Sequence, residues 1–187
     1  MSKIVKNRLN KSGTLKFLNK KIYLNKNFII PTFIIFTKSE FIKDETKTIR
    51  KIKKKFNKKI ILRSSSFNED TNMFTNAGLY KSYVVKKTTT QELKKKIHQI
   101  INEFENLNDQ IIAQEFVEKV DLAGVAFTRD PNINAPYYII NYDTSGYTNK
   151  ITSGVKNLSS VTSVIYKEKK VKNKFKRLID QIKVFEK

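Results

Sequence analysis

The feature that most constrains this fold is an apolar stripe between Thr90 and Leu107. Its members recur at spacings of three and four residues: Leu93, Ile97, Ile100, Ile101, Phe104 and Leu107. This spacing predicts an amphipathic helix over 90–107, whose apolar face needs an equally apolar partner. Full burial of a side chain of this size contributes about 1.5 to 3 kcal/mol, so we expect the helix to be a main anchor of the core.

Short apolar runs before and after this stripe predict the strands that cover it. The runs lie at 59–64, 80–85, 110–117, 122–128, 137–142, 148–153 and 160–166. Two more apolar runs between Phe28 and Phe36 are interrupted by Pro31, which suits either strand, turn and strand or one bent edge strand. Since several strands follow one another directly, the sequence predicts an α+β fold with a mainly antiparallel sheet.

Three other segments favour helix, and one favours loop. Residues 11–18 read as a loop that enters a short helix, with Ser12 or Thr14 able to cap it. Residues 39–56 are charged and carry a sparse helical stripe, and residues 171–185 are amphipathic. The segment 65–78 is polar and is expected to form a loop.

Positive charge is the strongest compositional signal. The 187 residues include 38 Lys or Arg and 17 acids, for a formal net charge of +21. Such a balance suits a nucleic-acid binder, because cations near phosphates release counterions. However, the basic residues are spread over several segments, notably 51–55, 94–96 and 167–176. We therefore interpret the charge as solvated helix faces set by composition, and a nucleic-acid partner is not expected.

Missing residue types exclude several kinds of site. The chain has no Cys and a single His, His98. Disulfide scaffolds, thiolate zinc sites and thiol catalysis are therefore excluded, and no His-rich metal site is available. No apolar run approaches the roughly 18 to 20 residues of a membrane span, and the N-terminus leads into no signal-peptide core. We expect no membrane partner and a cytoplasmic location.

An arginine at a strand end suggests anion-binding chemistry. Arg63 follows an apolar strand and precedes three serines, which places a planar fork of donors beside several hydroxyls. The alternative is a surface strand end whose serines begin a turn. Nearby, Glu69 and Asp70 would either bind a cation or pair with Arg63. Most of the five glycines lie in loops that would let main-chain amides approach a phosphate, but none forms a P-loop or Rossmann fingerprint.

The order of several short motifs along the chain is a more specific signal. They are a Lys followed four residues later by Leu at 11–15, a Pro-containing strand at 30–33, Arg-Ser-Ser at 63–65, an acidic pair at 69–70, a small-Ala-Gly turn at 76–78, strands at 113–117 and 123–131, and Thr-Ser-Gly at 152–154. In this order and spacing, the chain resembles the ATP-binding domain of the phosphoenolpyruvate synthase and pyruvate phosphate dikinase family, an ATP-grasp relative. The resemblance covers roughly residues 8 to 186.

The resemblance implies a nucleotide site made by residues far apart in the sequence. The opening Lys of the family and the Arg of its Arg-Ser-Ser motif contact ATP phosphates, so this role carries over to Lys11 and Arg63, and also to Arg129. The strand at 114–117 looks like the one that lines the adenine, with main-chain groups of Glu115 and Val117 as hydrogen-bond partners. Positioned cations of this kind stabilise the charge on a transferring phosphoryl group.

The resemblance also implies domains and ligands outside this chain. In the family, acids of a later C-terminal segment hold Mg²⁺, and a histidine on a separate swivelling domain accepts the phosphoryl group before it passes to an acceptor. We therefore expect residues 1–187 to form part of an ATP-grasp-like domain, with lobes at about 8–60 and 61–187 and no catalytic or metal-binding residue of its own. The Gly-Gly that precedes the opening Lys in the family is Leu9-Asn10 here. His98 is expected at the surface rather than as a phosphocarrier.

These signals predict the ATP-binding portion of a phosphotransferase, either a dikinase or a small-molecule kinase, whose acceptor the sequence does not name. Because the magnesium-binding acids are expected elsewhere, the chain alone is predicted to bind ATP weakly and to transfer no phosphoryl group. Two alternatives stay open. One is a non-catalytic binder of nucleic acid or another polyanion, and the other is a degenerate family member kept as an interaction module. A steep fall of affinity with salt would favour the polyanion binder over a nucleotide pocket.

Overall fold

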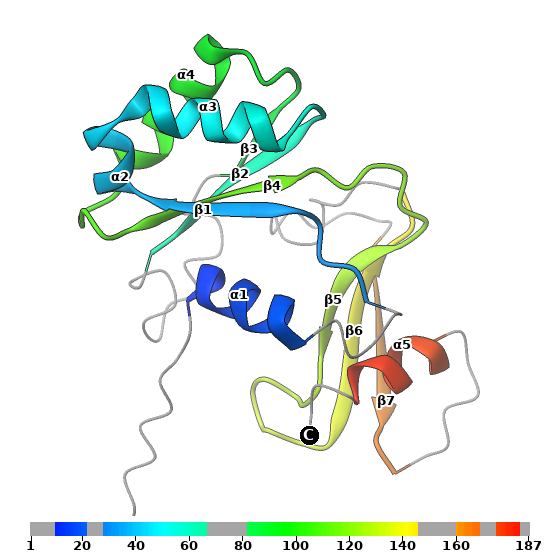
Figure 1. The fold of residues 1–187 in the computed structure, drawn as a ribbon. Coiled ribbons are helices and arrows are strands. Elements are labelled where there is room, and N and C mark those ends of the chain that lie inside the picture. Colours follow the sequence, from blue (N-terminus) through cyan, green and yellow to red (C-terminus); the bar gives the residue numbers. More distant parts are fainter. Residues whose placement is uncertain (1–9, 22–27, 67–81, 146–159, 169–174, 184–187) are drawn as a thin grey trace, which may run out of the picture. The chain divides into compact units, whose positions relative to one another are not determined.

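The computed structural model describes residues 10–21, 28–66, 82–145, 160–168 and 175–183. These residues form an α+β fold, as predicted, with five helices and seven strands (Figure 1): α1 Lys11–Lys21, β1 Phe33–Thr37, α2 Lys38–Lys43, α3 Glu45–Lys55, β2 Ile60–Ser65, β3 Ser82–Val85, α4 Thr90–Ile101, β4 Gln110–Glu115, β5 Ala123–Phe127, β6 Tyr137–Asp143, β7 Ser160–Tyr166 and α5 Lys176–Ile182. Strands β1, β4, β2 and β3, in that order, form sheet A, and β5, β6 and β7 form sheet B.

The chain divides into two compact units, residues 1–116 with sheet A and residues 117–187 with sheet B. The lobe boundary expected near residue 60 therefore lies inside unit 1. Strand β1, from before that boundary, pairs with β4 from after it, and β4 also pairs with β2. A single sheet thus joins the two segments that the sequence interpretation had separated.

The antiparallel register of sheet A sorts its side chains onto two faces. Leu62 of β2 lies opposite Ala113 of β4, and the next residue of β2, Arg63, lies opposite Ile112. Directly opposite residues share a face and successive residues alternate between faces. One face therefore carries Leu62 and Ala113 into the main core, while the other carries Arg63 and Ile112.

Helices α2, α3 and α4 cover the first face of sheet A (Figure 1). The buried side chains between them form the larger core: Phe36, Phe41, Ile49, Ile52, Phe56, Ile60, Leu62, Val85, Leu93, Ile97, Ile100, Ile101, Phe104, Ile111 and Ala113. Leu93 and Ile97 of α4 are fully buried. The predicted packing of this helix against an antiparallel sheet is confirmed.

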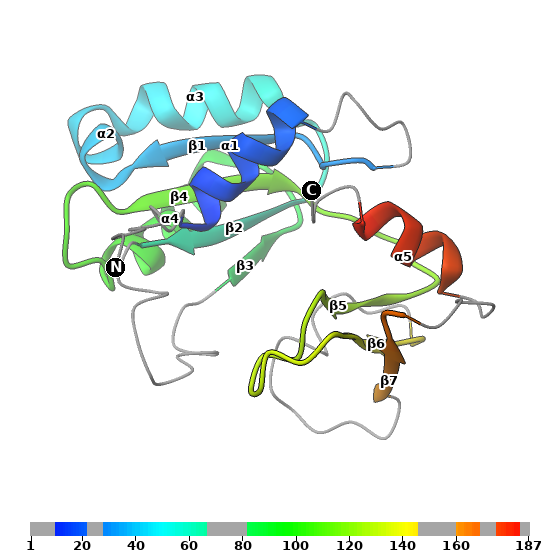
Figure 2. The same cartoon turned by 90° about the horizontal axis from the view of Figure 1, so that it is seen from below.

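Helix α1 lies on the second face of sheet A and runs across β4 (Figures 1 and 2). Ile112, in the middle of β4, is fully buried on this side. Because α1 and the pair α3 and α4 lie on opposite faces, unit 1 is a three-layered arrangement of helix, sheet and helices.

Unit 2 contains sheet B and, in its described part, one helix. Tyr138, Ile140 and Tyr142 alternate along the central strand β6 and pack with Phe175 and Ile179 at α5. This face of β6 and α5 make the second, smaller core. The helical stripe predicted within 171–185 is confirmed over the described residues of that segment.

Six predicted strands are confirmed within two residues at each end, as β2 to β7. The apolar runs around Pro31 give one edge strand, β1, which pairs only with β4. The strand predicted at 148–153, most of the loop at 65–78 and the motifs at 69–70, 76–78 and 152–154 lie outside the described residues. No helix in the described ranges has the length and apolar character needed to cross a bilayer.

The helix predicted over 90–107 is too long. Helix α4 starts after Thr89, whose hydroxyl accepts a hydrogen bond from the Glu92 amide at 3.2 Å, and it ends at Ile101. Phe104 stays buried in the following loop, whereas Leu107 is 59% exposed. Lys38 Nζ donates to the Phe104 carbonyl at 2.8 Å. The loop therefore continues the apolar stripe without continuing the helix.

The segment predicted as one helical stripe at 39–56 forms two helices. They meet at Asp44, whose carboxylate accepts a hydrogen bond from the Lys47 amide at 2.8 Å and so caps α3. The two helices therefore do not share one apolar face. Ile42 of α2 is 59% exposed, whereas Ile49 and Ile52 of α3 are buried. An aspartate that competes for backbone amides explains the break.

Candidate functional site

A buried polar cluster fixes the start of α1 to sheet A. The Ser12 amide donates to the Ser65 hydroxyl at 3.0 Å, and the Ser12 hydroxyl donates to the side-chain oxygen of Gln110. Ser12 and Ser65 are 1% and 0% exposed. We name the four residues Asn10, Ser12, Ser65 and Gln110 the α1 anchor. It joins the first turn of α1 to the end of β2 and the beginning of β4.

Asn10 caps α1, so the predicted cap at Ser12 or Thr14 is wrong. Its Oδ1 accepts a hydrogen bond from the Gly13 amide at 2.9 Å. This donor fixes the orientation of the Asn10 amide, with Nδ2 on the other side. Nδ2 is buried and has no hydrogen-bond partner among the described residues. A buried donor of this kind costs about 1 to 3 kcal/mol unless an acceptor satisfies it.

Lys11 and Arg63 lie beside the α1 anchor. Lys11 is the first residue of α1, directly before Ser12. Arg63 precedes Ser65 by two positions on β2, so the side chains of Arg63 and Ser65 lie on the same face of sheet A, the one that α1 covers. Arg63 is half-buried there. The fold therefore brings together the two segments that carry the predicted phosphate-binding cations.

The two residues predicted to lie near adenine are at the other end of β4. Glu115 is opposite Ile60, and its amide donates to the Thr32 carbonyl at 2.8 Å. This N–H is thus already used within unit 1. Val117 is 46% exposed and is the first residue of unit 2. Their role with adenine stays a prediction.

Arg129 lies in the loop between β5 and β6 of unit 2. It is exposed, and its Nη1 donates to the Asn134 carbonyl of the same loop at 3.3 Å. The carboxylate of Asp130 accepts hydrogen bonds from the amides of Asn132 and Ile133. Arg129 therefore belongs to a loop that is ordered by its own hydrogen bonds.

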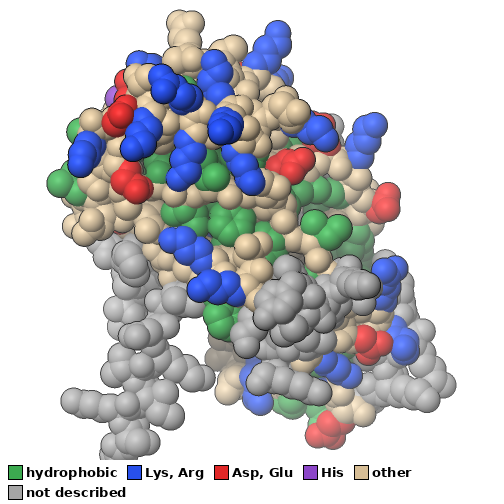
Figure 3. All heavy atoms as spheres, in the orientation of Figure 1, with side chains coloured by type: hydrophobic (Ala, Val, Ile, Leu, Met, Phe, Trp, Pro, Cys, Tyr) green, Lys and Arg blue, Asp and Glu red, His purple; other side chains and the backbone are tan. Residues whose placement is uncertain are grey.

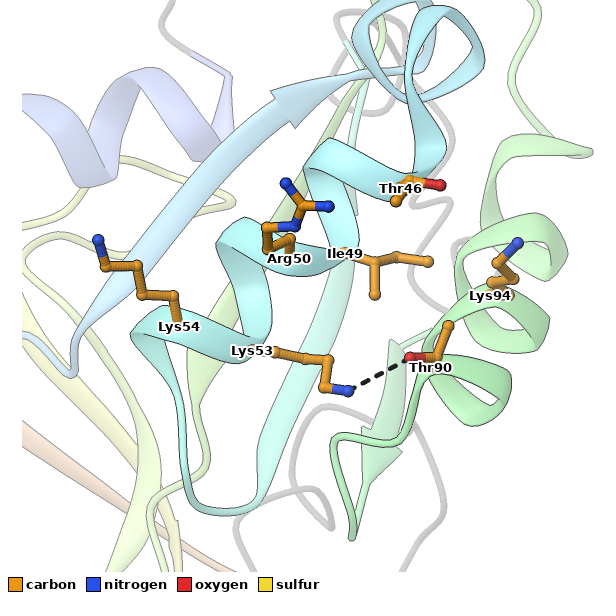
Figure 4. A pocket seen from close by; sticks show the side chains of 7 residues that line it. All are labelled: Thr46, Ile49, Arg50, Lys53, Lys54, Thr90 and Lys94. Carbon is orange, nitrogen blue, oxygen red and sulfur yellow. Dashed lines mark hydrogen bonds between the residues drawn. The ribbon is translucent and has the colours of Figure 1, made fainter.

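A second candidate site is a groove of about 480 Å³ between α3 and α4 (Figure 4). We name it the α3–α4 groove, and its lining residues are Thr46, Ile49, Arg50, Lys53, Lys54, Thr90 and Lys94. Figure 4 shows Lys53 extending from α3 toward α4, where its Nζ donates to the Thr90 hydroxyl at 3.3 Å. Lys54 extends from the opposite side of α3. Four cations and two hydroxyls thus surround an apolar floor formed by Ile49.

One carboxylate sits beside this groove. Glu45 accepts hydrogen bonds from Lys94 Nζ at 2.8 Å and pairs with His98 Nε2 at 3.0 Å. The hydrogen bond from Lys94 lowers the pKa of Glu45 below its ordinary value, and His98 adds to this effect against the opposing effect of burial. The His98 side chain is 53% exposed and its ring packs edge-on against Phe41. Its predicted surface position is confirmed.

An open hollow of about 500 Å³ lies along the second half of α1. Lys16 and Lys20 of α1 line it together with Lys55, and Phe33 at the start of β1 adds an apolar wall. Lys16 lies five residues after Lys11 on the same helix. This surface therefore extends the positive charge of α1 away from the α1 anchor.

The described residues at the start of α1 fit an anion. Asn10 Nδ2 is a buried donor, and Lys11 and Arg63 are cations on the two elements that the α1 anchor joins. Mg²⁺ at a nucleotide is usually held by one or two carboxylates together with phosphate oxygens and water. No group of three His, Asp or Glu side chains that could hold a metal ion is found within the described ranges.

Sequence reasoning missed Asn10, Gln110 and the α3–α4 groove. Asn10 and Gln110 are ordinary polar residues at the ends of elements, and only the docking of α1 on sheet A gives them a shared role. The groove depends on two lysine-rich helices that are separated by more than 30 positions in the sequence. The available signal was the pair of basic runs at 51–55 and 94–96, each within a segment predicted to be helical.

The chain was also compared with known proteins. No protein-family model matches it, and no curated protein matches it either.

Proposed function

We propose that unit 1 binds the phosphates of ATP at the α1 anchor, as part of a phosphotransferase. The observation that carries the proposal is the hydrogen bond from the Ser12 amide to the Ser65 hydroxyl. It holds the helix that begins with Lys11 against the strand that carries Arg63. Lys11, the first residue of α1, therefore belongs to the helix that lies on the face of sheet A that carries Arg63, 52 positions away in the sequence.

The donors at this end of sheet A match the chemistry of phosphate oxygens. Arg63 offers a planar fork of N–H donors, Lys11 a compact positive charge, and Asn10 Nδ2 a neutral buried donor. The first turn of α1 adds the positive end of the helix dipole. Charge on phosphoryl oxygens is stabilised by donors of this kind when they are fixed before the ligand arrives.

The ATP-grasp-like fold and the phosphotransferase activity belong to this proposal through the family resemblance. The resemblance assigns the adenine to the strand that includes Glu115 and Val117, and a further phosphate contact to Arg129. By the same resemblance, the phosphoryl group would pass to a histidine of another domain. ATP supplies the transferable phosphoryl group, and the residues of this chain bind and orient it. The resemblance assigns the acids that hold Mg²⁺ to a later segment, so we expect weak binding and no turnover by this chain alone.

The test is an NMR titration of the chain with ATP, because weak binding is still visible in amide shifts. We expect the shifts to cluster at the start of α1 and the end of β2. Arg63→Ala should raise the Kd for ATP by about 10- to 150-fold, which corresponds to the 1.5 to 3 kcal/mol of a charged hydrogen bond. Lys11→Ala should act in the same direction.

Arg177→Ala is the matched control, because Arg177 is an exposed arginine on α5 in the other unit. It should leave the titration unchanged. Adenosine, which lacks phosphates, should shift none of the α1 amides. If Arg63→Ala binds ATP as well as the parent chain does, or if adenosine reproduces the α1 shifts, the phosphate assignment is wrong.

A further inference from the structure

More than half of the net charge of the protein comes from two segments of unit 1. Residues 43–59 contain nine Lys or Arg and two acids, and residues 86–98 contain five Lys and one acid. Their net charges of +7 and +4 account for eleven of the 21 positive charges, in 30 of 187 residues. Figure 3 shows Lys and Arg side chains gathered over the part of the molecule that carries α2 and α3. Composition alone does not explain this concentration.

The fold brings the two basic segments together across the α3–α4 groove. They are far apart in the sequence, but Lys53 of α3 donates a hydrogen bond to Thr90 of α4. Arg50 and Lys54, one helical turn apart on α3, also line the groove, and Figure 4 shows Lys54 extending away from α4. None of the described residues that line the groove is an acid, and Glu45 beside it is paired with Lys94 and His98. A ligand in the groove thus meets several unneutralised positive charges.

We propose that the α3–α4 groove and the lysines around it bind the phosphate backbone of a duplex nucleic acid. Several cations along one surface suit a ligand with closely spaced charges, and duplex DNA carries one negative charge per 1.7 Å of helix axis. This site lies on the opposite face of sheet A from the α1 anchor. It is therefore a second site, beyond the nucleotide site proposed above.

None of the described residues that line the α3–α4 groove is aromatic, which favours a duplex over a single strand. Proteins that bind single strands stack the bases on exposed aromatic rings. Helix α3 has no aromatic residue, and the ring of His98 in α4 is held by Glu45 and Phe41. Lysines, one arginine and threonine hydroxyls contact phosphates and carry no base readout. The binding is therefore independent of sequence.

The test is fluorescence anisotropy with a labelled 20-base-pair DNA duplex of mixed sequence, across 50 to 200 mM salt. The groove variant combines Arg50→Gln, Lys53→Gln and Lys54→Gln. The control variant combines Lys119→Gln, Arg177→Gln and Lys183→Gln, which are exposed residues of unit 2. Both variants lose three charges, so they keep the same net charge. Thermal unfolding of both variants checks that they fold.

We expect the groove variant to bind the duplex at least about tenfold more weakly than the control variant. The slope of log affinity against log salt concentration should be less steep for the groove variant by about 2 to 3, because each lost phosphate contact removes about 0.9 from the slope. Equal weakening by both variants would mean that net charge alone drives binding. Competition by polyglutamate as effective as competition by unlabelled duplex would assign the groove to an acidic protein. Either outcome overturns the proposal.

A second measurement needs no variant. Acetylation of lysines in the parent chain, followed by mass spectrometry, reports which amines the duplex covers. Lys53 and Lys54 should be protected by the duplex, while Lys183 should react at its original rate. Equal reactivity of Lys53 with and without the duplex would also overturn the proposal.

Discussion

The Ser12 amide donates a hydrogen bond of 3.0 Å to the Ser65 hydroxyl, 53 residues further along the chain. Helix α1 depends on such a contact more than the other helices of unit 1 do. It contains Gly13 in its first turn, which weakens a helix, and its Phe17 is 51% exposed. A helix with so little apolar surface to bury needs polar anchoring to stay on the sheet.

Ser65→Ala should therefore detach the first turn of α1. The substitution leaves the buried Ser12 amide without an acceptor, which costs about 1 to 3 kcal/mol of unfolding free energy. Urea unfolding measures the loss, and hydrogen exchange should show faster exchange of α1 amides than of α4 amides. Ser82→Ala is the control, because Ser82 is an exposed serine of β3 in the same sheet. Equal exchange rates for α1 in parent and variant would contradict the anchoring role.

Glu45→Gln should destabilise unit 1 in a pH-dependent way. Lys94 and His98 hold the pKa of Glu45 below its ordinary value of 4.5, so the folded state favours the charged carboxylate. A lowered pKa adds stability that is fully present above about pH 4.5 and is lost as the pH falls through the folded value. The pair is partly solvated, so the loss at pH 7 is at most about 1 kcal/mol.

Thermal unfolding at several pH values measures this difference. The stability gap between the parent chain and Glu45→Gln should be constant near neutral pH and should close in acid. Glu105→Gln is the control, because Glu105 is an exposed residue of the loop after α4. A gap that is the same at pH 7 and pH 3 would show that the charge of Glu45 plays no part.

Gly124→Ala should destabilise unit 2 although position 124 is exposed. Gly124 of β5 lies opposite Tyr142 of β6, and a Cβ added there would collide with the Asn141 carbonyl oxygen and lie 2.9 Å from the Tyr142 Cα. These are backbone atoms of the paired strand, so they yield only if β5 moves. We expect a loss of about 1 to 3 kcal/mol, the scale of overpacking.

The control for Gly124→Ala is Ala126→Ser, at an exposed position two residues later on the same strand. It should change the unfolding free energy by no more than about 0.5 kcal/mol. If position 124 had enough space, alanine would instead stabilise the chain by about 0.4 to 1 kcal/mol, because it lowers the conformational entropy of the unfolded chain. The sign of the measured change therefore decides between the two cases.

The sequence predicted elements that depend on local pattern and missed those that depend on tertiary docking. Apolar runs located the strands β2 and β4, and an apolar residue at every third or fourth position located the buried face of α4. Each of these segments has an apolar side to bury. The end of α4 was missed, since Phe104 is buried as a loop residue and so continues the stripe. Asp44 was missed as a cap between two helices because the apolar stripe on either side looked continuous.

The candidate sites show the same limit. Arg63 was singled out because an arginine at the end of an apolar strand is unusual in itself. Asn10 gave no such signal, because asparagine is a common helix cap. It becomes notable only when the structure shows that its Nδ2 is buried. The basic runs at 51–55 and 94–96 were read as separate solvated faces. Only the packing of α3 beside α4 turns them into one surface.

Asn10 gives the sharpest prediction about the α1 anchor, because its two side-chain atoms do different things. Oδ1 caps α1, and Nδ2 is the buried donor that we assign to phosphate. Asn10→Ser and Asn10→Asp both keep an oxygen for the cap. Because Asn10→Ser removes the unsatisfied buried donor, it should raise the free energy of unfolding of the ligand-free chain by about 1 to 3 kcal/mol. Both remove the donor, and Asn10→Asp adds a negative charge where the phosphate would lie.

The affinity for ATP should therefore fall in the order parent, Asn10→Ser, Asn10→Asp. Loss of one hydrogen bond to a charged phosphate, about 1.5 to 3 kcal/mol, corresponds to about a 10- to 150-fold rise in Kd for Asn10→Ser, and charge repulsion should make Asn10→Asp weaker still. Asn108→Asp makes the same chemical change at an exposed loop position and should leave the Kd unchanged. NMR titration gives the affinities, and urea unfolding gives the stabilities. If Asn10→Asp binds ATP like the parent chain, Nδ2 does not face the phosphate. If Asn10→Asp and Asn108→Asp weaken binding equally, the effect comes from net charge and not from the α1 anchor.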